Sequence, residues 1–356
     1  MTNALHHLAK PVFSLCVFLL VACGPSAEGE LRDGDDSLID THTEDTATEA
    51  SSIPPDAHEA ADIIVTVLGS GTPVPSATQF GSAVLVQAAG KHFMFDCGRG
   101  CTTRLAQLDP SLIAKVDHLF VTHFHSDHLM GIDDLLLNGW TQGRKAPLKT
   151  WGPVGTNDMM LAIQEAFRVD IDQRKSDGVP APSAALDDYY TDLPAEGGLV
   201  LDEDGIKITA FIVDHGSVEP AYGYKLEYNG RAVVISGDTT ETPSLYEYGR
   251  GADVLLLEVV SPSMTEYIAT HFSQKQLEKV LSLHLTAEQA SDIFNGTNPR
   301  IGVYYHTSRG GNSVDSLLSV TNALYAGEVV VSHDLFQILV GEQIYVRDMS
   351  PEGLGG

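Results

Sequence analysis

The sequence predicts an α/β fold for most of the chain. From Asp62 onward, short β-rich runs alternate with amphipathic stretches of helical period, and glycines separate many of them. Asn229-Gly230 lies between two of the β-rich runs, which is typical of a tight β-hairpin. With 356 residues, of which 43% are hydrophobic and 19% charged, the chain is long enough to bury a large core.

The first 22 residues are expected to be a leader and not part of the fold. Lys10 precedes an apolar stretch, residues 11–22, that is too short to span a bilayer as a mature helix. The stretch ends Leu-Val-Ala before Cys23, which resembles a bacterial lipobox; an ordinary secretory signal is the alternative. We therefore predict lipidation of Cys23 and a lipid-anchored protein of the bacterial cell envelope, on its periplasmic or extracellular face.

Residues 23–60 are expected to be a disordered tether. From residue 24 to residue 60 the chain carries eleven carboxylates and one arginine, with almost no large apolar side chains. Such a segment buries too little surface to offset the entropy lost on ordering. The folded domain is therefore placed at residues 61–350.

Local patterns predict the elements of this domain. Strands are expected at Ile63–Leu68, Ser82–Gln87, Lys91–Phe95, Asp117–Val121, Ile206–Val213, Tyr222–Tyr228, Arg231–Ile235, Val254–Leu257 and Ile301–Tyr305. Helices are expected at Arg99–Leu108, His128–Asn138, Thr156–Phe167, Ser273–Leu283 and Ala287–Phe294. Thr286 and Gln289 form a capping box for the last helix. Residues 170–204 are rich in proline, glycine and aspartate, so a long loop is expected there, and short strands are expected from residue 329.

Three histidines and an aspartate follow one of these strands within six residues, in the run LFVTHFHSDH (119–128). Alternate side chains of an extended segment share a face, so His123, His125 and Asp127 point the same way. His128 begins the next helix and turns back toward them. Imidazoles and a carboxylate at a strand end suit zinc. Because these four exceed what one tetrahedral ion with an open position accepts, two adjacent metal ions are the simpler interpretation.

Further motifs follow in order along the chain: LGSGTP (68–73), MFDCG (94–98), DHG (214–216) followed by AYGY (221–224), ISGDT (235–239) and VYYH (303–306). Together with the histidine cluster they resemble the metallo-β-lactamase superfamily, from about residue 62 to residue 340. The resemblance implies a four-layer αββα sandwich with a hydrolytic site for two zinc ions, at the loop ends between its sheets. Mn²⁺ and iron are the alternative metals.

The same resemblance implies the roles of individual residues. The first zinc ion would be held by His123, His125 and His215. The second would be held by Asp127, His128 and His306. Asp238 would bridge the two ions, so Asp127 and Asp238 are also candidate catalytic residues. Asp96 and Glu258 would orient the ligands from outside.

The last ligand has a rival in the sequence. The run THFS (270–273) resembles the terminal His-Phe-Ser of the ribonuclease Z group, which would make His271 the ligand. However, His271 opens a helix, whereas His306 stands at the end of the apolar strand 301–305. His306 is therefore the favoured ligand.

The pairing of Asp127 with His128, and Asp238 in a Gly-Asp-Thr context, resemble the branch that contains ribonuclease Z, cyclic-nucleotide phosphodiesterases and zinc arylsulfatases. The run HLTAEQ (284–289) resembles the extra histidine motif of this branch, which implies that His284 protonates the leaving oxygen or binds an anionic group. A structural histidine near a helix start is the alternative. Arg309 is a further candidate for anion binding, with an exposed, solvated arginine as its alternative.

The charge of the chain bears on which substrate is expected. The net charge is −27, and residues 168–204 carry ten carboxylates against three basic residues, so no basic arm for nucleic acid is expected. The segments 151–153 and 166–174 are similar to arylsulfatase-like members. We therefore predict an arylsulfatase-like hydrolase that acts on a small anionic ester and has no nucleic-acid partner. It would contact the membrane through its lipid anchor only. A homodimer is compatible with the sequence. A phosphodiesterase, acting on cyclic nucleotides or ribonuclease Z-like, is the enzymatic alternative, ahead of a lactonase. A catalytically idle metal-binding surface protein is the alternative from another class.

Cys97 and Cys101 are four residues apart at the start of an expected helix. Their spacing permits a disulfide bond in an oxidising compartment, although the geometry on a helix would be strained. Two buried thiols are the favoured interpretation.

Overall fold

The computed structural model describes residues 53–178, 183–308 and 311–350. The expected leader, the lipidation site Cys23 and most of the expected tether lie outside the described residues, as does Arg309. Among the residues described, no helix has the length and apolar character needed to cross a membrane.

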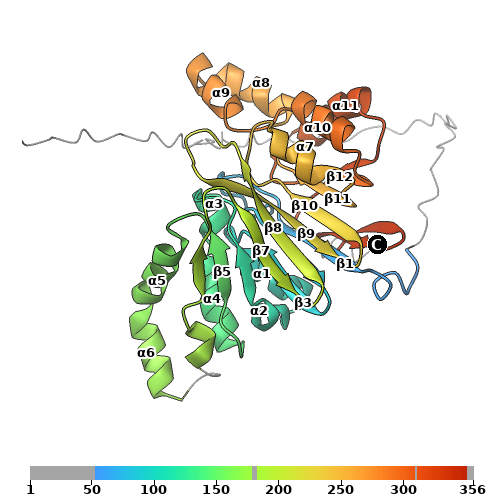
Figure 1. The fold of residues 1–356 in the computed structure, drawn as a ribbon. Helices are drawn as coiled ribbons and strands as arrows, with labels where there is room; N and C mark the ends of the chain where they lie inside the picture. Colours follow the sequence, from blue (N-terminus) through green and yellow to red (C-terminus); the bar gives the residue numbers. More distant parts are fainter. Residues whose placement is uncertain (1–52, 179–182, 309–310, 351–356) are drawn as a thin grey trace, which may run out of the picture. The chain divides into compact units, whose positions relative to one another are not determined.

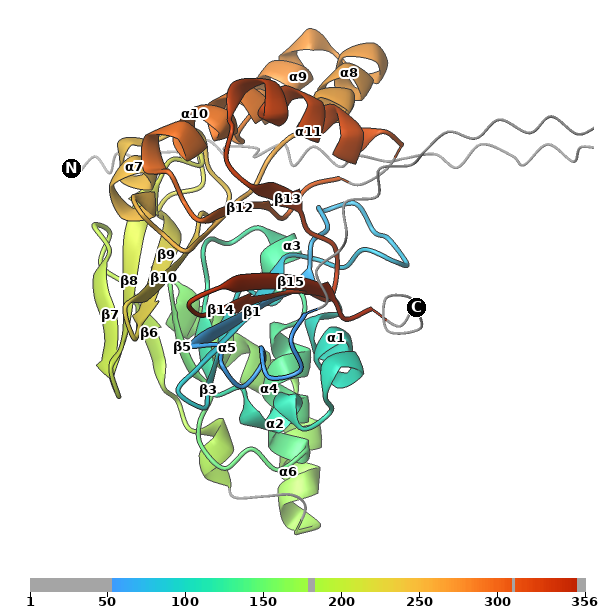
Figure 2. The ribbon, with the colours of Figure 1, turned by 90° about the vertical axis from the view of Figure 1, so that its right-hand side faces the viewer.

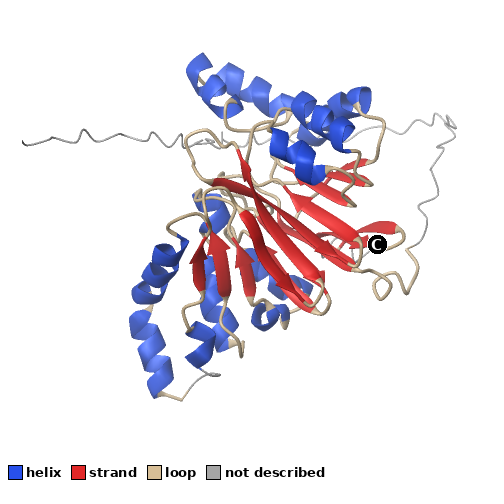
Figure 3. Ribbon diagram, viewed as in Figure 1, coloured by secondary structure: helices blue, strands red, loops and turns tan. Residues whose placement is uncertain are grey.

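Two β-sheets form the centre of the fold (Figures 1 and 3). The first has the strand order β15-β14-β1-β2-β3-β4-β5-β6 and the second β13-β12-β11-β10-β9-β8-β7. The first sheet consists of β1 (Ile63–Gly69), β2 (Ala83–Ala88), β3 (Lys91–Phe95), β4 (His118–Phe120), β5 (Lys149–Gly152), β6 (Tyr190–Asp192), β14 (Phe336–Val340) and β15 (Ile344–Asp348). The second consists of β7 (Gly198–Glu203), β8 (Ile206–Val213), β9 (Ala221–Tyr228), β10 (Arg231–Ile235), β11 (Val254–Leu257), β12 (Ile301–Tyr304) and β13 (Val329–Val331).

Helices cover the outer face of each sheet (Figure 2). Those of the first half are α1 (Cys101–Leu108), α2 (Leu112–Lys115), α3 (Ser126–Leu129), α4 (Ile132–Thr141), α5 (Thr156–Ala166), α6 (Arg168–Ser176) and the 3₁₀ turn η1 (Ser183–Leu186). Those of the second half are α7 (Pro243–Gly249), α8 (Pro262–His271), α9 (Gln274–Leu281), α10 (Ala287–Thr297) and α11 (Ser313–Leu324).

Three apolar layers hold these elements together. The middle layer lies between the sheets and includes Val65, Phe120, Ile208 and Leu256. One outer layer packs the first sheet against α1, α2 and α4, and the other packs the second sheet against α7, α10 and α11. Each buried Val, Leu, Ile or Phe contributes roughly 1.5–3 kcal/mol, against about 1 kcal/mol for a helix cap, so packing decides the architecture. The arrangement is the predicted four-layer αββα sandwich.

The predicted elements are found with some corrections. Each of the nine expected strands overlaps an observed strand, and the capping box of Thr286 and Gln289 is present at α10. The helix expected at 128–138 is instead two helices, α3 and α4. They are separated at Gly131, where a side chain would meet the backbone oxygen of Gly98 at 2.5 Å.

The long loop expected at 170–204 is wrong, because this stretch contains the end of α6, η1, β6 and β7. Each piece is too short to show a period in the sequence. Strand β7 nevertheless had a signal, since Asp204-Gly205 joins it to β8 as a hairpin.

Two further expectations need correction. The expected tether extends too far, because Ala57 is only 5% exposed and packs with Ile64 and Leu339. Cys97 and Cys101 form a disulfide bond and are not two thiols. Cys97 lies in the turn before α1, not on the helix itself, and this brings the two Cα atoms to 5.5 Å, a usual spacing for a disulfide.

Candidate metal centre

The candidate site lies where the carboxyl ends of strands from both sheets meet. Strand β4 runs parallel to β3 and β5, and β10 runs parallel to β11 and β12. The loops after β4, β8, β10 and β12 carry, in turn, the histidine cluster, His215, Asp238 and His306. Strands of one direction place their last residues at one edge, and this is why ligands far apart in the sequence converge.

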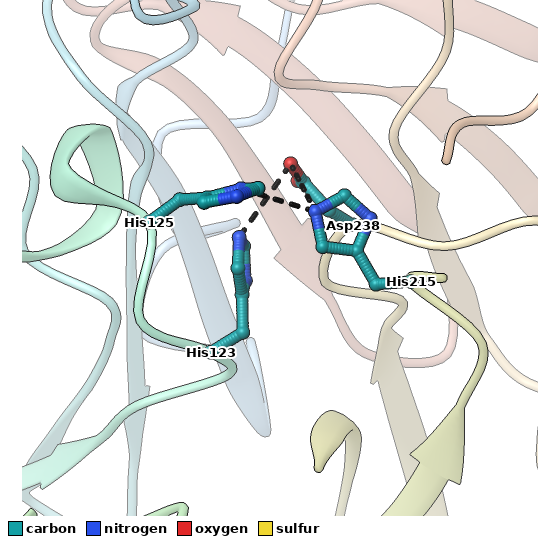
Figure 4. Close-up of side chains that lie close together, drawn as sticks. All are labelled: His123, His125, His215 and Asp238. Atoms are coloured by element: carbon teal, nitrogen blue, oxygen red, sulfur yellow. Dashed lines mark hydrogen bonds and ion pairs between the residues drawn. The ribbon is translucent and has the colours of Figure 1, made fainter. Parts of the chain in front are cut away.

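One group of ligand atoms comes from His123, His125, His215 and Asp238, which lie within 4.8 Å of one another (Figure 4). The three imidazoles and the carboxylate point toward a common centre. His215 Nε2 is 3.1 Å from His125 Nδ1, and Asp238 Oδ2 is 3.7 Å from His123 Nε2. These side chains form what we call the first ligand group.

A second ligand group consists of Asp127, His128 and His306, whose ligand atoms also lie within 4.8 Å of one another. His306 Nε2 is 3.5 Å from Asp127 Oδ2. Asp238 Oδ1 is 3.3 Å from both His128 Nε2 and His306 Nε2. Asp238 therefore directs Oδ2 to the first group and Oδ1 to the second, which is the position of a bridging ligand.

The buried ligand atoms fit divalent cations. Within the described part of the chain, the buried atoms that have no hydrogen-bond partner include His123 Nε2, His128 Nε2, Asp127 Oδ2 and Asp238 Oδ1. A buried polar atom without a partner costs free energy, and a metal ion is one way to satisfy it. Imidazole nitrogens and carboxylate oxygens together suit zinc and similar ions.

Electrostatics prepare part of the first group for metal binding. Burial, followed by the neighbouring His128, holds the pKa of His123 well below its usual range. Burial and then His215 lower the pKa of His125 to about 4. Both imidazoles are therefore neutral at pH 7, which leaves a nitrogen lone pair for a cation.

In the second ligand group, the charges of neighbouring side chains outweigh the effect of burial on the pKa values. Burial lowers the pKa of His128, but Asp238 and Asp96 together raise it well above the ordinary value. Burial raises the pKa of Asp238, but His306 and His128 lower it well below its usual range. The carboxylates thus concentrate negative charge where a cation would be held.

Hydrogen bonds from outside the site fix the orientation of the imidazoles. Asp96 Oδ2 accepts from His128 Nδ1 at 2.7 Å, and the two oxygens of Asp96 also accept from the amide and hydroxyl of Thr122 at 2.8 Å each. His215 Nδ1 donates to the carbonyl of Leu283 at 2.8 Å, and His306 Nδ1 donates to that of Gly71 at 2.7 Å. Because Nδ1 carries the donated hydrogen, the lone pair of Nε2 is free to bind a metal ion.

His284 lies beside the ligands, next to Glu258. Glu258 Oε1 accepts from the amides of Thr239 and Leu285 at 3.1 Å each, and lies 3.3 Å from His284 Nδ1. His284 Nδ1 is 3.9 Å from Asp238 Oδ2, and its side chain is 21% exposed. Burial lowers the pKa of His284, but Glu258 raises it, and the result is about 9. The imidazole is therefore at the edge of the site and carries a proton at neutral pH.

The structure brings together all seven expected ligands, along with Asp96, Glu258 and His284. The rival ligand His271 is exposed at the end of α8, where Nδ1 donates to Tyr267 O, and is not part of either group. Thr122 and the carbonyls of Gly71 and Leu283 also hold the site, and none of them is expected from the sequence. A backbone carbonyl leaves no mark on the sequence, so only the fold could reveal the last two.

A family model described as anti-Pycsar protein Apyc1 matches residues 63–279. The chain is similar to ribonuclease Z of Mycobacterium marinum, with 31% identity over 289 residues, covering 78% of this chain and 99% of the relative.

Solved structures show the same fold. The metallo-β-lactamase fold protein YhfI from Bacillus subtilis has a TM-score of 0.56 and 19% identity, covering 77% of this chain and 98% of that chain. The short form of human tRNase Z has a TM-score of 0.56 and 23% identity, with the same coverage. These likenesses confirm the predicted αββα fold.

The comparisons also correct the expected partners. The relatives are named ribonuclease Z and tRNase Z, enzymes of RNA, so the expectation of a small-molecule ester and no nucleic acid is wrong. A net negative charge does not by itself exclude a nucleic-acid substrate. Net charge governs non-specific attraction, whereas a metal site attracts phosphate groups through local positive charge. The comparisons favour the phosphodiesterase alternative and give the arylsulfatase-like prediction no support.

Proposed function

Because this chain belongs both to the ribonuclease Z branch of the metallo-β-lactamase superfamily and to the family of the anti-Pycsar protein Apyc1, we propose that it is a two-zinc phosphodiesterase acting on RNA. It is a metal-dependent hydrolase of this branch. The phosphodiester bond as the point of attack, zinc as the metal and RNA as the substrate are the parts that we propose.

The position of Asp238 is the observation that carries the proposal. One carboxylate oxygen faces His123 and the other faces His128 and His306, so a single side chain can contact two ions. His123, His125 and His215 would hold one ion, and Asp127, His128 and His306 the other. The partnerless buried atoms of both groups support the same assignment.

Two bound divalent ions supply positive charge for the phosphoryl group in the transition state and generate a nucleophile from water near neutral pH. The residues of the chain do the rest. Asp96, Leu283 and Gly71 hold the imidazoles of His128, His215 and His306 so that each Nε2 faces the site. Ligands fixed in this way need no reorganisation when charge develops.

His284 is positioned to give a proton to the leaving oxygen. Its Nδ1 hydrogen is directed at Glu258, so the proton on Nε2 is the one available for transfer. Glu258 also fixes the backbone on either side, through the amides of Thr239 and Leu285. The carboxylate thus sets the distance between His284 and the loop that carries Asp238.

The first test compares esters. The purified chain is loaded with Zn²⁺, its metal content is measured, and it is assayed with bis(p-nitrophenyl) phosphate, with p-nitrophenyl sulfate and with a 3′-extended precursor tRNA. We expect two ions per chain, hydrolysis of the diester and of RNA, and loss of both activities in Asp238→Ala. Turnover of the sulfate alone would replace the proposal with an arylsulfatase. Full metal loading without any turnover would identify a catalytically idle metal-binding protein.

We also propose that the chain is lipid-anchored at Cys23 in a bacterial cell envelope, on its periplasmic or extracellular face. The lipobox-like run before Cys23 supports this. Labelled fatty acid should enter the full chain expressed in a bacterium and should be absent from Cys23→Ser. A wild-type chain that takes up no label would refute the anchor.

A further inference from the structure

The loop after β1, residues 70–81, contacts two of the three residues in the second ligand group. The carbonyl of Gly71 accepts the 2.7 Å hydrogen bond from His306 Nδ1. Gly81 lies directly against the backbone of Asp127, because a methyl group added at Gly81 would come within 2.6 Å of the Asp127 carbonyl oxygen. We refer to this segment as loop 70–81.

Loop 70–81 also holds the backbone on which His306 stands. His306 has a φ of 42°, in the left-handed region that residues other than glycine rarely adopt. The next amide, that of Thr307, donates to the carbonyl of Ser70 at 3.1 Å, and Gln79 Nε2 donates to the carbonyl of Thr307 at 2.7 Å. The side chain and the backbone of this ligand therefore both depend on the loop.

One buried carboxylate joins the two ends of loop 70–81. Asp334, in the turn before β14, is 6% exposed. Its Oδ1 accepts from the amide and hydroxyl of Ser70, at 3.0 and 2.9 Å. Its Oδ2 accepts from the amide of Phe80 at 2.8 Å. A loop whose two ends are bound to a single side chain has few conformations open to it.

Arg104 of α1 completes this network. It donates to Asp334 Oδ2 from Nε at 3.0 Å and from Nη2 at 2.9 Å, which offsets the cost of burying the carboxylate. Its guanidinium lies 4.4 Å from the centre of the Phe80 ring, and Nη2 donates to the carbonyl of Thr78 at 2.8 Å. The pair therefore clamps the far half of the loop as well as its ends.

We propose that Asp334 is a positioning residue for the second metal ion, acting through loop 70–81 on His306 and Asp127. Asp334 does not itself contact a ligand, and the path runs through Ser70 and Phe80 to Gly71 and Gly81. The inference rests on the proposed two-ion site. Because the loop contacts described above are to the second ligand group, loss of Asp334 weakens the second ion in preference to the first.

The test uses Asp334→Asn in the full chain. An asparagine keeps the shape of the side chain, but its amide nitrogen donates hydrogen bonds and cannot accept them. Where this nitrogen replaces Oδ2, the hydrogen bonds from the Phe80 amide and from Arg104 are lost. Metal-free protein is titrated with Zn²⁺ by calorimetry, and the two dissociation constants are compared with those of the wild type. We expect the constant for the second ion to rise by about 10–100-fold, and that for the first to change by less than about threefold.

The matched control is Asp253→Asn. Asp253 is also 6% exposed and is also bound to an arginine and a backbone amide: Arg300 Nη1 at 2.7 Å and the Ala232 amide at 2.8 Å. It precedes β11 and so lies at the opposite end of that strand from Glu258. Asp253→Asn should lower the resistance to urea while leaving both zinc constants unchanged, so that a general loss of stability is distinguished from a loss of positioning.

If Asp334→Asn does not fold, Gln79→Ala tests whether loop 70–81 positions the second ligand group. Gln79 is only partly buried, and its truncation leaves the Asp334–Arg104 pair intact while removing one of the two hydrogen bonds between the loop and Thr307. The same selective weakening of the second ion is expected. Wild-type affinity for the second ion in every variant that folds would overturn the proposal. A wild type that binds fewer than two ions would instead refute the proposed function.

Discussion

Asp96 and His128 form a hydrogen bond of 2.7 Å in which His128 Nδ1 donates to Asp96 Oδ2, and this leaves His128 Nε2 at 3.3 Å from Asp238. The bond fixes which ring nitrogen of His128 carries the proton. Asp96 is held in turn by the amide and hydroxyl of Thr122. Its geometry is therefore set before any cation arrives.

The first prediction concerns this bond. In Asp96→Asn the amide replaces one carboxylate oxygen by a donor, so the proton on Nδ1 is no longer fixed and Nε2 is less available. We expect the dissociation constant of the second zinc ion to rise by about 10–100-fold, measured by competition with a chelating dye. Asp117→Asn is the control, because Asp117 binds His118 Nδ1 at the same 2.7 Å near the start of β4, away from the ligands. Equal zinc constants for Asp96→Asn and wild type would contradict the assigned role.

The second prediction concerns the bridge. Asp238→Asn retains the size of the side chain but removes the charge shared by the two ligand groups. We expect both zinc constants to rise, and hydrolysis of bis(p-nitrophenyl) phosphate to fall by at least about 100-fold, since the ions would lose both affinity and position. Elemental analysis after gel filtration gives the metal content. Retention of two ions at full occupancy would show that Asp238 does not bridge them.

Much of the site was predictable because its side chains lie in runs that have a chemical signature. The cluster at 119–128 combines an apolar strand with three imidazoles and a carboxylate, and His306 directly follows the run IGVYY (301–305). Asp334 had no such mark. It is a single acidic residue in a turn, and its importance depends on Ser70, Phe80 and Arg104, which are brought to it only by the pairing of β14 with β1.

The strands, too, were predictable from the sequence only in part. Strands such as β1 and β11 are buried along their whole length and are read from a continuous apolar run. Strands β5 and β6 have four and three residues, too few to show an alternation, and form because each pairs with a parallel neighbour in the sheet. Their stability comes from the sheet and not from local preference, so local pattern could not predict them.

The third prediction separates His284 from the ligands. His284→Ala should slow hydrolysis by about 100- to 10,000-fold while leaving two zinc ions bound, because a proton donor contributes to the rate and not to metal affinity. The defect should be smaller for p-nitrophenyl esters, whose leaving group needs little protonation, than for a ribose leaving group. His271→Ala, at the exposed end of α8, should behave as wild type. Loss of zinc in His284→Ala would make the residue a ligand instead.

The fourth prediction concerns the metal-free protein at alkaline pH. The pKa of His284 is raised to about 9 in the folded chain, against 6.5 for an ordinary histidine, because burial lowers it but Glu258, Asp238 and Asp127 together raise it by more. A raised pKa means that the folded state binds the proton more tightly than the unfolded state does. The stabilisation is therefore complete below about pH 6.5 and is lost as the pH rises to about 9.

Urea unfolding in excess chelator, at a series of pH values between 6 and 10, measures this loss. The free energy of unfolding should fall over that range, and the share of the fall that His284→Ala abolishes should be on the order of 3 kcal/mol at most, because the raised pKa of His128 contributes to the fall as well. His271→Ala is again the matched control, since its imidazole is exposed and bonded only to its own helix. An identical pH dependence in wild type and His284→Ala would show that the Glu258–His284 contact does not stabilise the fold.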